Sequence, residues 1–226
     1  MTFAAVKALL FDLDGTLVDS VPDLAEAVDR MLADFGHPPA GEAKVRLWVG
    51  TGSRSLVSRA LSDAKGGQAD DELIERALAN YFDHYEARLC VRSRLYEGVS
   101  DTLARLRSEG YPLAIVTNKP ERFVRPLLDG LGIAQHFSAM IGGDTLAQRK
   151  PHPQPLLHAA DALGVEPTQA LMIGDSRNDI EAARAARIPV VCVPYGYNHG
   201  RDVREYHPDR LIERFGDLLT LLSEAA

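Results

Sequence analysis

Short apolar runs alternate with amphipathic stretches along most of the chain. The apolar runs are too short for ordinary helices and predict buried strands at Val6–Phe11, Leu113–Thr117, Ala139–Gly142, Ala170–Ile173 and Val190–Val193. Stretches with helical spacing lie between or after them, at Val99–Ser108, Glu121–Leu131, Pro153–Leu163, Ile180–Ala186 and Leu211–Leu222. Strands that alternate with helices predict an α/β fold, a Rossmann-like doubly wound parallel sheet.

The long stretch between the first two expected strands breaks this alternation. Helical spacing of apolar residues runs through 24–35 and again through 73–85, with no comparably clear strand pattern between them. A sheet rarely leaves so long a gap between two strands unless something folded fills it, so we expect a helical insertion over the carboxyl end of the sheet. The expected domains are a core formed by 1–16 and 93–226, and a cap formed by 17–92.

Composition and charge narrow the class of protein. The 226 residues are 46% hydrophobic, enough for a sizeable core, and the net charge of -7 gives no general attraction to nucleic acid or an anionic membrane. The amino-terminal residues form neither a membrane span nor a signal peptide, so we expect a cytoplasmic protein. Cys90 and Cys192 lack metal-type or redox-type spacing and are expected to be reduced thiols.

Two carboxylates follow the first expected strand. Asp12 and Asp14 stand one residue apart, directly before Gly15. Ligands of open α/β sheets bind beyond the carboxyl ends of the strands, and two such close carboxylates repel each other unless a cation lies between them. Either residue alone could be an ordinary turn or helix-cap residue, but the pair at a strand end favours function.

A similar layout recurs after the strand at Ala170–Ile173. Asp175 could complete a Mg²⁺ site with Asp12 and Asp14, because Mg²⁺ prefers hard oxygen ligands. Asp179 would lie behind these ligands in the outer shell, although a role as a cap of the following helix is equally compatible with its position.

Two more strand ends carry polar groups suited to a phosphate. Thr117 and Asn118 follow the second expected strand, and Lys150 follows the third. A lysine ammonium can offset the negative charge of a phosphate brought against a carboxylate. Taken singly, Lys150 could equally be a surface lysine.

These residues form four ordered blocks: DLDGT at Asp12–Thr16, VTN at Val116–Asn118, KP at Lys150–Pro151 and GDSRND at Gly174–Asp179. Together they resemble the haloacid dehalogenase-like superfamily, and the resemblance covers the whole chain. The helical insertion is similar to the C1-type cap of that superfamily. VGTGSRSLVSRAL at Val49–Leu61, LAQRKPHPQPLL at Leu146–Leu157 and PYGYN at Pro194–Asn198 resemble most the bacterial phosphoglycolate phosphatases.

The resemblance implies a two-step phosphatase mechanism. Asp12 would attack phosphorus and form an aspartyl phosphate, and Asp14 would protonate the leaving alkoxide and then deprotonate the attacking water. Thr117, Asn118 and Lys150 would bind the transferred phosphoryl group. The implied substrate is a small phosphomonoester, foremost 2-phosphoglycolate, which would be hydrolysed to glycolate and phosphate.

The same resemblance implies a bound cation. Mg²⁺ would be held by side-chain oxygens of Asp12 and Asp175 and by the main-chain carbonyl of Asp14. The expected partner is a small phosphorylated metabolite, with no nucleic acid and no membrane, and the protein is expected to be a monomer or a homodimer.

Substrate selection is expected in the cap. Gly52 and Arg54 lie in a glycine-spaced loop that resembles the segment covering the substrate in related enzymes, and an arginine can pair with a carboxylate or phosphate. Arg54 could also be an exposed helix residue. Phosphatases acting on N-acetylmuramic acid 6-phosphate, pyrophosphate or nucleotides, a β-phosphoglucomutase-like isomerase and a non-catalytic phosphate-binding module stay open as alternatives.

Overall fold

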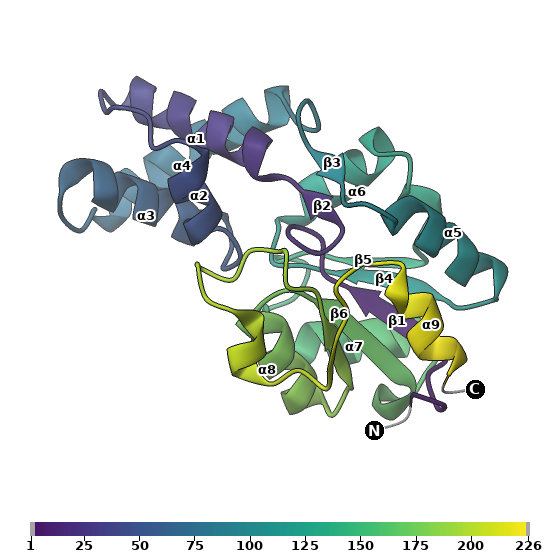
Figure 1. Ribbon diagram of the computed structural model, residues 1–226. Helices are drawn as coiled ribbons and strands as arrows, with labels where there is room; N and C mark the ends of the chain where they lie inside the picture. Colours follow the sequence, from purple (N-terminus) through teal and green to yellow (C-terminus); the bar gives the residue numbers. More distant parts are fainter. Residues whose placement is uncertain (1–2, 225–226) are drawn as a thin grey trace.

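The computed structural model describes residues 3–224 and shows a parallel sheet with a group of helices beside it (Figure 1). The sheet has six strands in the order β5-β4-β1-β6-β7-β8, and every neighbouring pair is parallel. In chain order these strands are β1 (Ala8–Phe11), β4 (Leu113–Val116), β5 (Ala139–Ile141), β6 (Ala170–Gly174), β7 (Val190–Cys192) and β8 (Arg210–Leu211). The predicted α/β fold is confirmed.

Strand register brings the polar strand ends together. Phe11, at the end of the central strand β1, stands opposite Ile115 of β4 and Ile173 of β6. Parallel strands in this register end at one edge of the sheet, so the residues that follow them in the chain emerge side by side.

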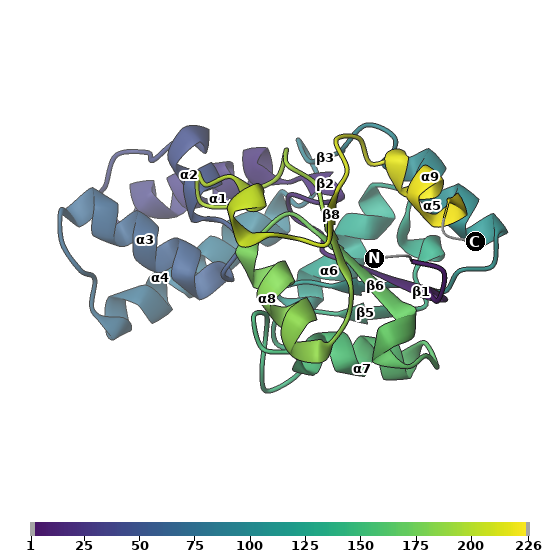
Figure 2. The ribbon, with the colours of Figure 1, turned by 60° about the horizontal axis from the view of Figure 1, so that its bottom comes forward.

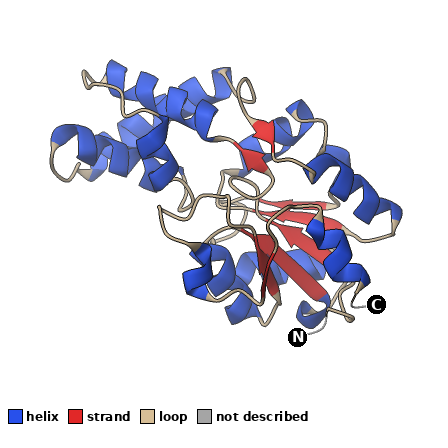
Figure 3. Cartoon of the chain, in the orientation of Figure 1, coloured by secondary structure: helices blue, strands red, loops and turns tan. Residues whose placement is uncertain are grey.

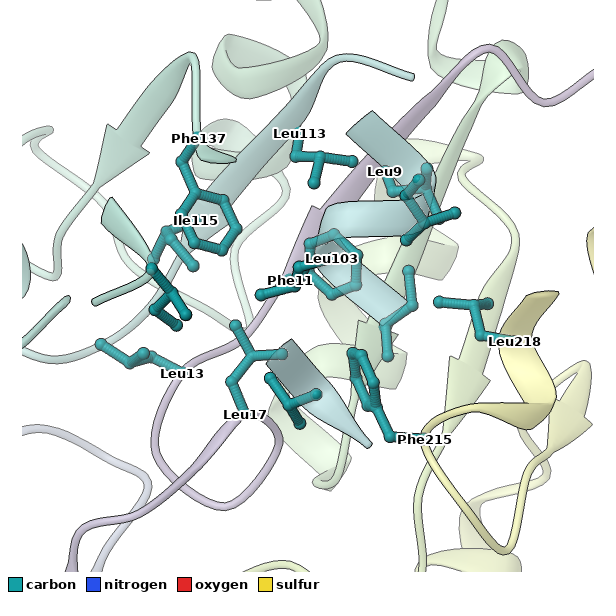
Figure 4. Close-up of a cluster of buried hydrophobic side chains, with 14 of the residues drawn as sticks. Leu9, Phe11, Leu13, Leu17, Leu103, Leu113, Ile115, Phe137, Phe215 and Leu218 are labelled. Atoms are coloured by element: carbon teal, nitrogen blue, oxygen red, sulfur yellow. The ribbon is translucent and has the colours of Figure 1, made fainter. Parts of the chain in front are cut away.

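The two faces of the sheet are covered by different helices, as the alternation of side chains along a strand requires. Leu9 and Phe11 face a cluster that includes α5 (Val99–Ser108), α6 (Glu121–Gly130) and α9 (Asp217–Ser223), part of which is drawn in Figure 4. Leu10 belongs to a second cluster on the opposite face. The helices of that face are α7 (Gln154–Ala162) and α8 (Arg177–Ala186), which lie together in Figure 2.

The helical group lies beyond one edge of the sheet and has an apolar cluster largely its own. It contains α1 (Val21–Asp34), α2 (Glu42–Trp48), α3 (Ser53–Lys65) and α4 (Asp71–Ala87). Two short antiparallel strands, β2 (Val18–Asp19) and β3 (Arg94–Leu95), join it to the rest, as the colours of Figure 3 show. We call α1 to α4 the cap; the domain limits 16/17 and 92/93 stay a prediction.

Two differences from the expected elements have a local cause. The helix expected over Leu211–Leu222 begins only at Asp217, because Leu211 belongs to strand β8, where it pairs with Cys192 of β7. The two-residue strands are too short to show an alternating pattern in the sequence. Three single-turn 3-10 helices complete the regular structure of the described residues, at Ala134–His136, Pro167–Gln169 and Val203–Tyr206.

Within residues 3–224, no helix combines the length and the apolar character needed to cross a membrane.

Candidate active site

Asp12 and Asp14 lie where β1 leaves the sheet. The Asp12 backbone N–H donates to the Ile173 carbonyl at 2.9 Å, so the chain is still held by the β6 strand at this residue. Gly15 then turns the chain with φ +96°, a conformation that residues with a Cβ rarely adopt. The two carboxylates are therefore fixed by a strand on one side and a glycine turn on the other.

Lys150 is buried among oxygen atoms from three different segments. Its Nζ lies 2.8 Å from Asp12 Oδ1 and 2.6 Å from Asp179 Oδ1, and it donates to the Val116 carbonyl at 2.6 Å. Burial alone would lower the pKa of Lys150, but the Asp12 and Asp179 carboxylates raise it above its usual value. Lys150 is therefore a cation fixed beside Asp12.

Asp12 is almost fully buried as well. Burial raises the pKa of Asp12 to about 6, although the Lys150 ammonium acts in the opposite direction. With this pKa, Asp12 is ionised at neutral pH. Because the carboxylate is buried, few water molecules hydrate it, and a poorly hydrated carboxylate is well suited to act as a nucleophile.

Asp175 and Asp179 belong to the turn between β6 and α8. Asp175 accepts hydrogen bonds from the Thr16 hydroxyl at 2.8 Å and from the Tyr197 backbone N–H. Asp179 accepts from the Ser176 hydroxyl at 2.6 Å and the Ser176 N–H at 3.0 Å, which is the pattern of a capping box at the start of α8. Asp179 thus caps α8, which is one of the two roles that the sequence left open, and it also pairs with Lys150.

Glycines leave room for the Asp175 carboxylate. A Cβ at Gly15 would lie 2.5 Å from Asp175 Oδ2, and a Cβ at Gly196 would lie 2.3 Å from the same oxygen. Because real Cβ atoms do not approach an oxygen this closely, both positions need glycine while Asp175 stays in place. Two separate loops are therefore shaped around this one carboxylate.

Three carboxylates converge at this edge of the sheet. Oxygen atoms of Asp12, Asp175 and Asp179 lie within 4.8 Å of one another. Burial, and then the negative charges of Asp12 and Asp179, raise the pKa of Asp175 well above its usual value. Such buried negative charge is relieved by a cation bound between the carboxylates, and hard oxygen donors fit Mg²⁺.

Thr117 and Asn118 follow β4 and are both buried at the site. The Thr117 hydroxyl accepts from the Lys119 N–H at 3.2 Å. The Asn118 side-chain NH₂ donates to the Lys150 carbonyl at 3.0 Å and to the Gly50 carbonyl of the cap at 3.1 Å. Asn118 Oδ1 has no protein partner among the described residues. Asn118 thus joins the cap to the residues around the nucleophile.

A small pocket lies between these residues and the cap. It encloses about 40 Å³, and its lining includes Asp12, Asp14, Thr117, Asn118 and Lys150 from the sheet side. The cap contributes Gly50, Gly52, Leu56, Tyr81 and Tyr85. The sheet side is therefore polar, and the opposite wall is largely apolar.

The two cap residues predicted to bind substrate lie in different surroundings. Gly52 lines the pocket at the start of α3. Arg54 does not: its guanidinium pairs with Glu75 at 2.8 Å and with Asp71 at 2.6 Å on the outer surface of the cap. In this conformation Arg54 points away from the pocket, because its helix position turns it toward α4.

Lys119 is a pocket residue that the sequence analysis did not single out. Its Nζ lies 3.1 Å from both Asp14 oxygens, and its side chain is 3% exposed. The sequence offered little signal for it, since a lysine after Thr-Asn has the pattern of a loop lysine. Its position directly after the candidate phosphate-binding pair was the only indication.

Comparisons with known proteins agree with this geometry. The family model of haloacid dehalogenase-like hydrolases matches residues 6–187. The chain is 49% identical to a phosphoglycolate phosphatase of Nitrosococcus oceani, over 97% of this chain and 98% of the relative. It is also 49% identical to phosphoglycolate phosphatase 1 of Pseudomonas aeruginosa, over 97% and 81% of the two chains. A crystal structure described as a predicted phosphoglycolate phosphatase from Haemophilus somnus is similar, with a TM-score of 0.91, 40% identity and coverage of 96% and 98%.

Proposed function

Since the chain belongs to the haloacid dehalogenase-like hydrolases, we propose that it is a Mg²⁺-dependent phosphatase that hydrolyses 2-phosphoglycolate to glycolate and inorganic phosphate. The observation that carries this proposal is the placement of Asp12 and Asp14 in one small pocket, with Lys150 fixed 2.8 Å from Asp12. A nucleophile, a proton carrier and a cation are thereby available to one phosphate group.

In the first step, an Asp12 oxygen attacks phosphorus. The bond between phosphorus and the substrate's bridging oxygen breaks, and the electron pair leaves with that oxygen, which takes a proton from the Asp14 carboxyl group. The products of this step are glycolate and an aspartyl phosphate on Asp12. Asp12 needs no separate base, because its pKa of about 6 leaves it ionised at neutral pH.

In the second step, water attacks the phosphorus of the aspartyl phosphate. Asp14, now a carboxylate, accepts a proton from that water, and the bond between phosphorus and the Asp12 oxygen breaks. Inorganic phosphate is released and both aspartates return to their starting state. The glycine turn at Gly15 fixes Asp14 beside the departing and attacking oxygens, so one residue can serve both steps.

The remaining polar residues of the site bind the phosphoryl group. Lys150 neutralises charge on the transferred oxygens, with Asp179 and the Val116 carbonyl holding its ammonium in place. Thr117 and Asn118 line the same side of the pocket and would position those oxygens. Gly52 would bring the cap backbone close to the substrate.

The acidic residues fit a divalent cation. Side-chain oxygens of Asp12 and Asp175 and the main-chain carbonyl of Asp14 would hold Mg²⁺, and Asp179 would support them from behind. When bound, the cation supplies positive charge that offsets the repulsion between the Asp12 carboxylate and an anionic substrate. The glycines that abut Asp175 and the rise in its pKa support this assignment.

The size of the pocket supports a small substrate. In this conformation the cap leaves only about 40 Å³ of free space over the polar residues, so a substrate with a compact group beside its phosphate needs less opening of the cap than a sugar or a nucleoside. Relatives that match this chain almost end to end carry the name phosphoglycolate phosphatase. Together these favour 2-phosphoglycolate over the larger substrates considered from the sequence.

Phosphate release from a panel of substrates tests the proposal. The panel is 2-phosphoglycolate, N-acetylmuramic acid 6-phosphate, pyrophosphate and glucose 1-phosphate, each assayed with Mg²⁺ and again with a chelator. We expect a Mg²⁺-dependent preference for 2-phosphoglycolate that disappears in the Asp12→Asn variant. Metal-dependent release with another preferred substrate would overturn the substrate, and release that persists in the chelator would overturn the metal dependence.

A further inference from the structure

The contact between Lys119 and Asp14 places a second buried cation in the pocket. The Lys119 ammonium lies 3.1 Å from each oxygen of Asp14, the candidate acid and base. Lys119 comes from the loop after β4, far from Asp14 in the sequence, and its backbone N–H is held by the Thr117 hydroxyl at 3.2 Å. Lys119 is therefore held at its backbone N–H by Thr117 and at its ammonium by Asp14.

Of the described residues that line the pocket, Lys119 and Lys150 carry a positive charge. The Lys150 ammonium is already surrounded by Asp12, Asp179 and the Val116 carbonyl, next to the candidate nucleophile. The Lys119 ammonium faces a single carboxylate, that of Asp14. An ammonium has three N–H donors, so Lys119 can keep a bond to Asp14 and donate to one more anion.

The cap encloses this ammonium with apolar surface. Lys119 Nζ lies 4.8 Å from the centre of the Tyr85 ring of α4. Tyr81, Leu24 and Leu56 line the same cap side of the pocket. Because little water reaches this place, an ion pair formed here is stronger than one at the surface.

The proposed substrate has two anionic ends, and the pocket must bind both. With the phosphate at Asp12 and the leaving oxygen at Asp14, as the proposed mechanism requires, the carboxylate of a two-carbon substrate would extend past Asp14 toward the cap. Arg54, the cap cation that the sequence suggested for a substrate carboxylate or phosphate, is paired with Glu75 and Asp71 outside the pocket. Lys119 is the described cation that borders both Asp14 and the cap wall.

We propose that Lys119 is the specificity-determining residue of the pocket, and that its ammonium binds the substrate carboxylate while it stays in contact with Asp14. The inference rests on the proposed function, because it assumes a phosphomonoester with a carboxylate close to the ester oxygen. Binding of the carboxylate by Lys119 places the leaving oxygen next to Asp14. Recognition and proton transfer are coupled through this one side chain.

The test compares two substrates that differ in the carboxylate. These are 2-phosphoglycolate and ethyl phosphate, which has a methyl group in place of the carboxylate. We expect the Lys119→Met variant to lose about 100-fold in kcat/KM for 2-phosphoglycolate and far less for ethyl phosphate, so that the preference of the enzyme collapses. Lys44→Met is the matched control: Lys44 pairs with Asp63 on the cap surface and should leave both values unchanged.

Two further variants separate charge from shape. Lys119→Gln keeps hydrogen-bond donors but loses the charge, and should lose the preference as well. Lys119→Arg keeps the charge and should retain part of the preference for 2-phosphoglycolate over ethyl phosphate. These variants also serve if the methionine variant does not fold, which thermal unfolding monitored by circular dichroism would show.

The outcomes that overturn the inference are distinct from those that overturn the proposed function. If the wild-type enzyme prefers 2-phosphoglycolate and the Lys119 variants lose the same factor on both substrates, Lys119 acts only through Asp14 and the inference is wrong. If the wild-type enzyme shows no preference between the two substrates, the proposed substrate and the inference both fail. Absence of phosphate release from either substrate would overturn the phosphatase itself.

Discussion

The ammonium of Lys150 lies 2.6 Å from Asp179 Oδ1, and both side chains are buried. The other Asp179 oxygen accepts hydrogen bonds from the Ser176 backbone and hydroxyl at the start of α8. One carboxylate therefore connects the lysine beside the nucleophile to the turn that carries Asp175. We regard Asp179 as a positioning residue, because it acts on the site through Lys150 and through this turn.

Replacement of Asp179 should affect stability and activity together. Asp179→Asn keeps the shape of the side chain but leaves Lys150 with one carboxylate partner fewer in a buried place. We expect the free energy of unfolding to fall by about 3 kcal/mol, which urea denaturation can measure. We also expect kcat to fall at least tenfold. Asp161→Asn, on the exposed face of α7, is the control and should change neither quantity; an Asp179→Asn variant as stable as that control would contradict the positioning role.

The glycine that abuts Asp175 should be essential for metal binding. A Cβ at Gly196 would lie 2.3 Å from Asp175 Oδ2 and from Asp175 Cβ, so Gly196→Ala must displace the carboxylate or its loop. We expect the Mg²⁺ concentration for half-maximal activity to rise at least tenfold, because one ligand leaves its position. Gly67→Ala has open space around the added methyl group and should behave as wild type. Equal Mg²⁺ requirements in the two variants would show that Asp175 is not a ligand of the metal.

The raised pKa of Asp12 predicts a pH dependence of metal binding. Its pKa is about 6 in the metal-free protein, against an ordinary value of 3.8. A proton on Asp12 or on Asp175 competes with Mg²⁺, so the apparent affinity for Mg²⁺ should fall as the pH is lowered through about 6, by at least about tenfold per pH unit below it. Thermal stabilisation by Mg²⁺, measured between pH 4.5 and 8, tests this. Constant affinity down to pH 4.5 would contradict it.

The raised pKa of Asp12 also predicts how the stability of the metal-free protein changes with pH. Between pH 3.8 and about 6 the folded, metal-free protein holds a proton on Asp12 that the unfolded chain releases. Its contribution therefore makes the folded state less stable as pH rises through this window, opposite to the usual salt-bridged aspartate. At neutral pH the metal-free Asp12→Asn variant should unfold at a higher temperature than the metal-free wild type. A lower melting temperature would mean that Lys150 outweighs burial at this carboxylate.

Replacement of Arg54 should have little effect on activity. Its guanidinium is about half exposed and pairs with Asp71 and Glu75, and surface pairs of this kind contribute little to stability. Arg54→Met should change kcat/KM for 2-phosphoglycolate by less than about twofold. A fall of tenfold or more would show that Arg54 turns into the pocket when substrate binds, and would restore the role suggested by the sequence.

The sequence predicted the core of the site because parallel strands end at one edge of a sheet. Asp12, Thr117, Lys150 and Asp175 all follow strand patterns, so the fold brings them together once the strands are placed. It could not predict the direction of Arg54, because a helix rotation decides whether that side chain faces the pocket or α4. The burial of Lys119 could not be predicted either, because it depends on Tyr85, and the position of Tyr85 over the pocket is set by the packing of the cap helices.

The most direct test of the central claim is detection of a phosphoryl group on Asp12 during turnover. The enzyme would be mixed with Mg²⁺ and 2-phosphoglycolate, quenched in acid, digested and analysed by mass spectrometry of the peptide that contains Asp12. We predict that the phosphoryl group appears on Asp12 while substrate is present, disappears when it is exhausted, and is absent from Asp12→Asn. Phosphate released at the full rate by Asp12→Asn, with no phosphoryl group ever found on Asp12 of the wild type, would contradict the mechanism.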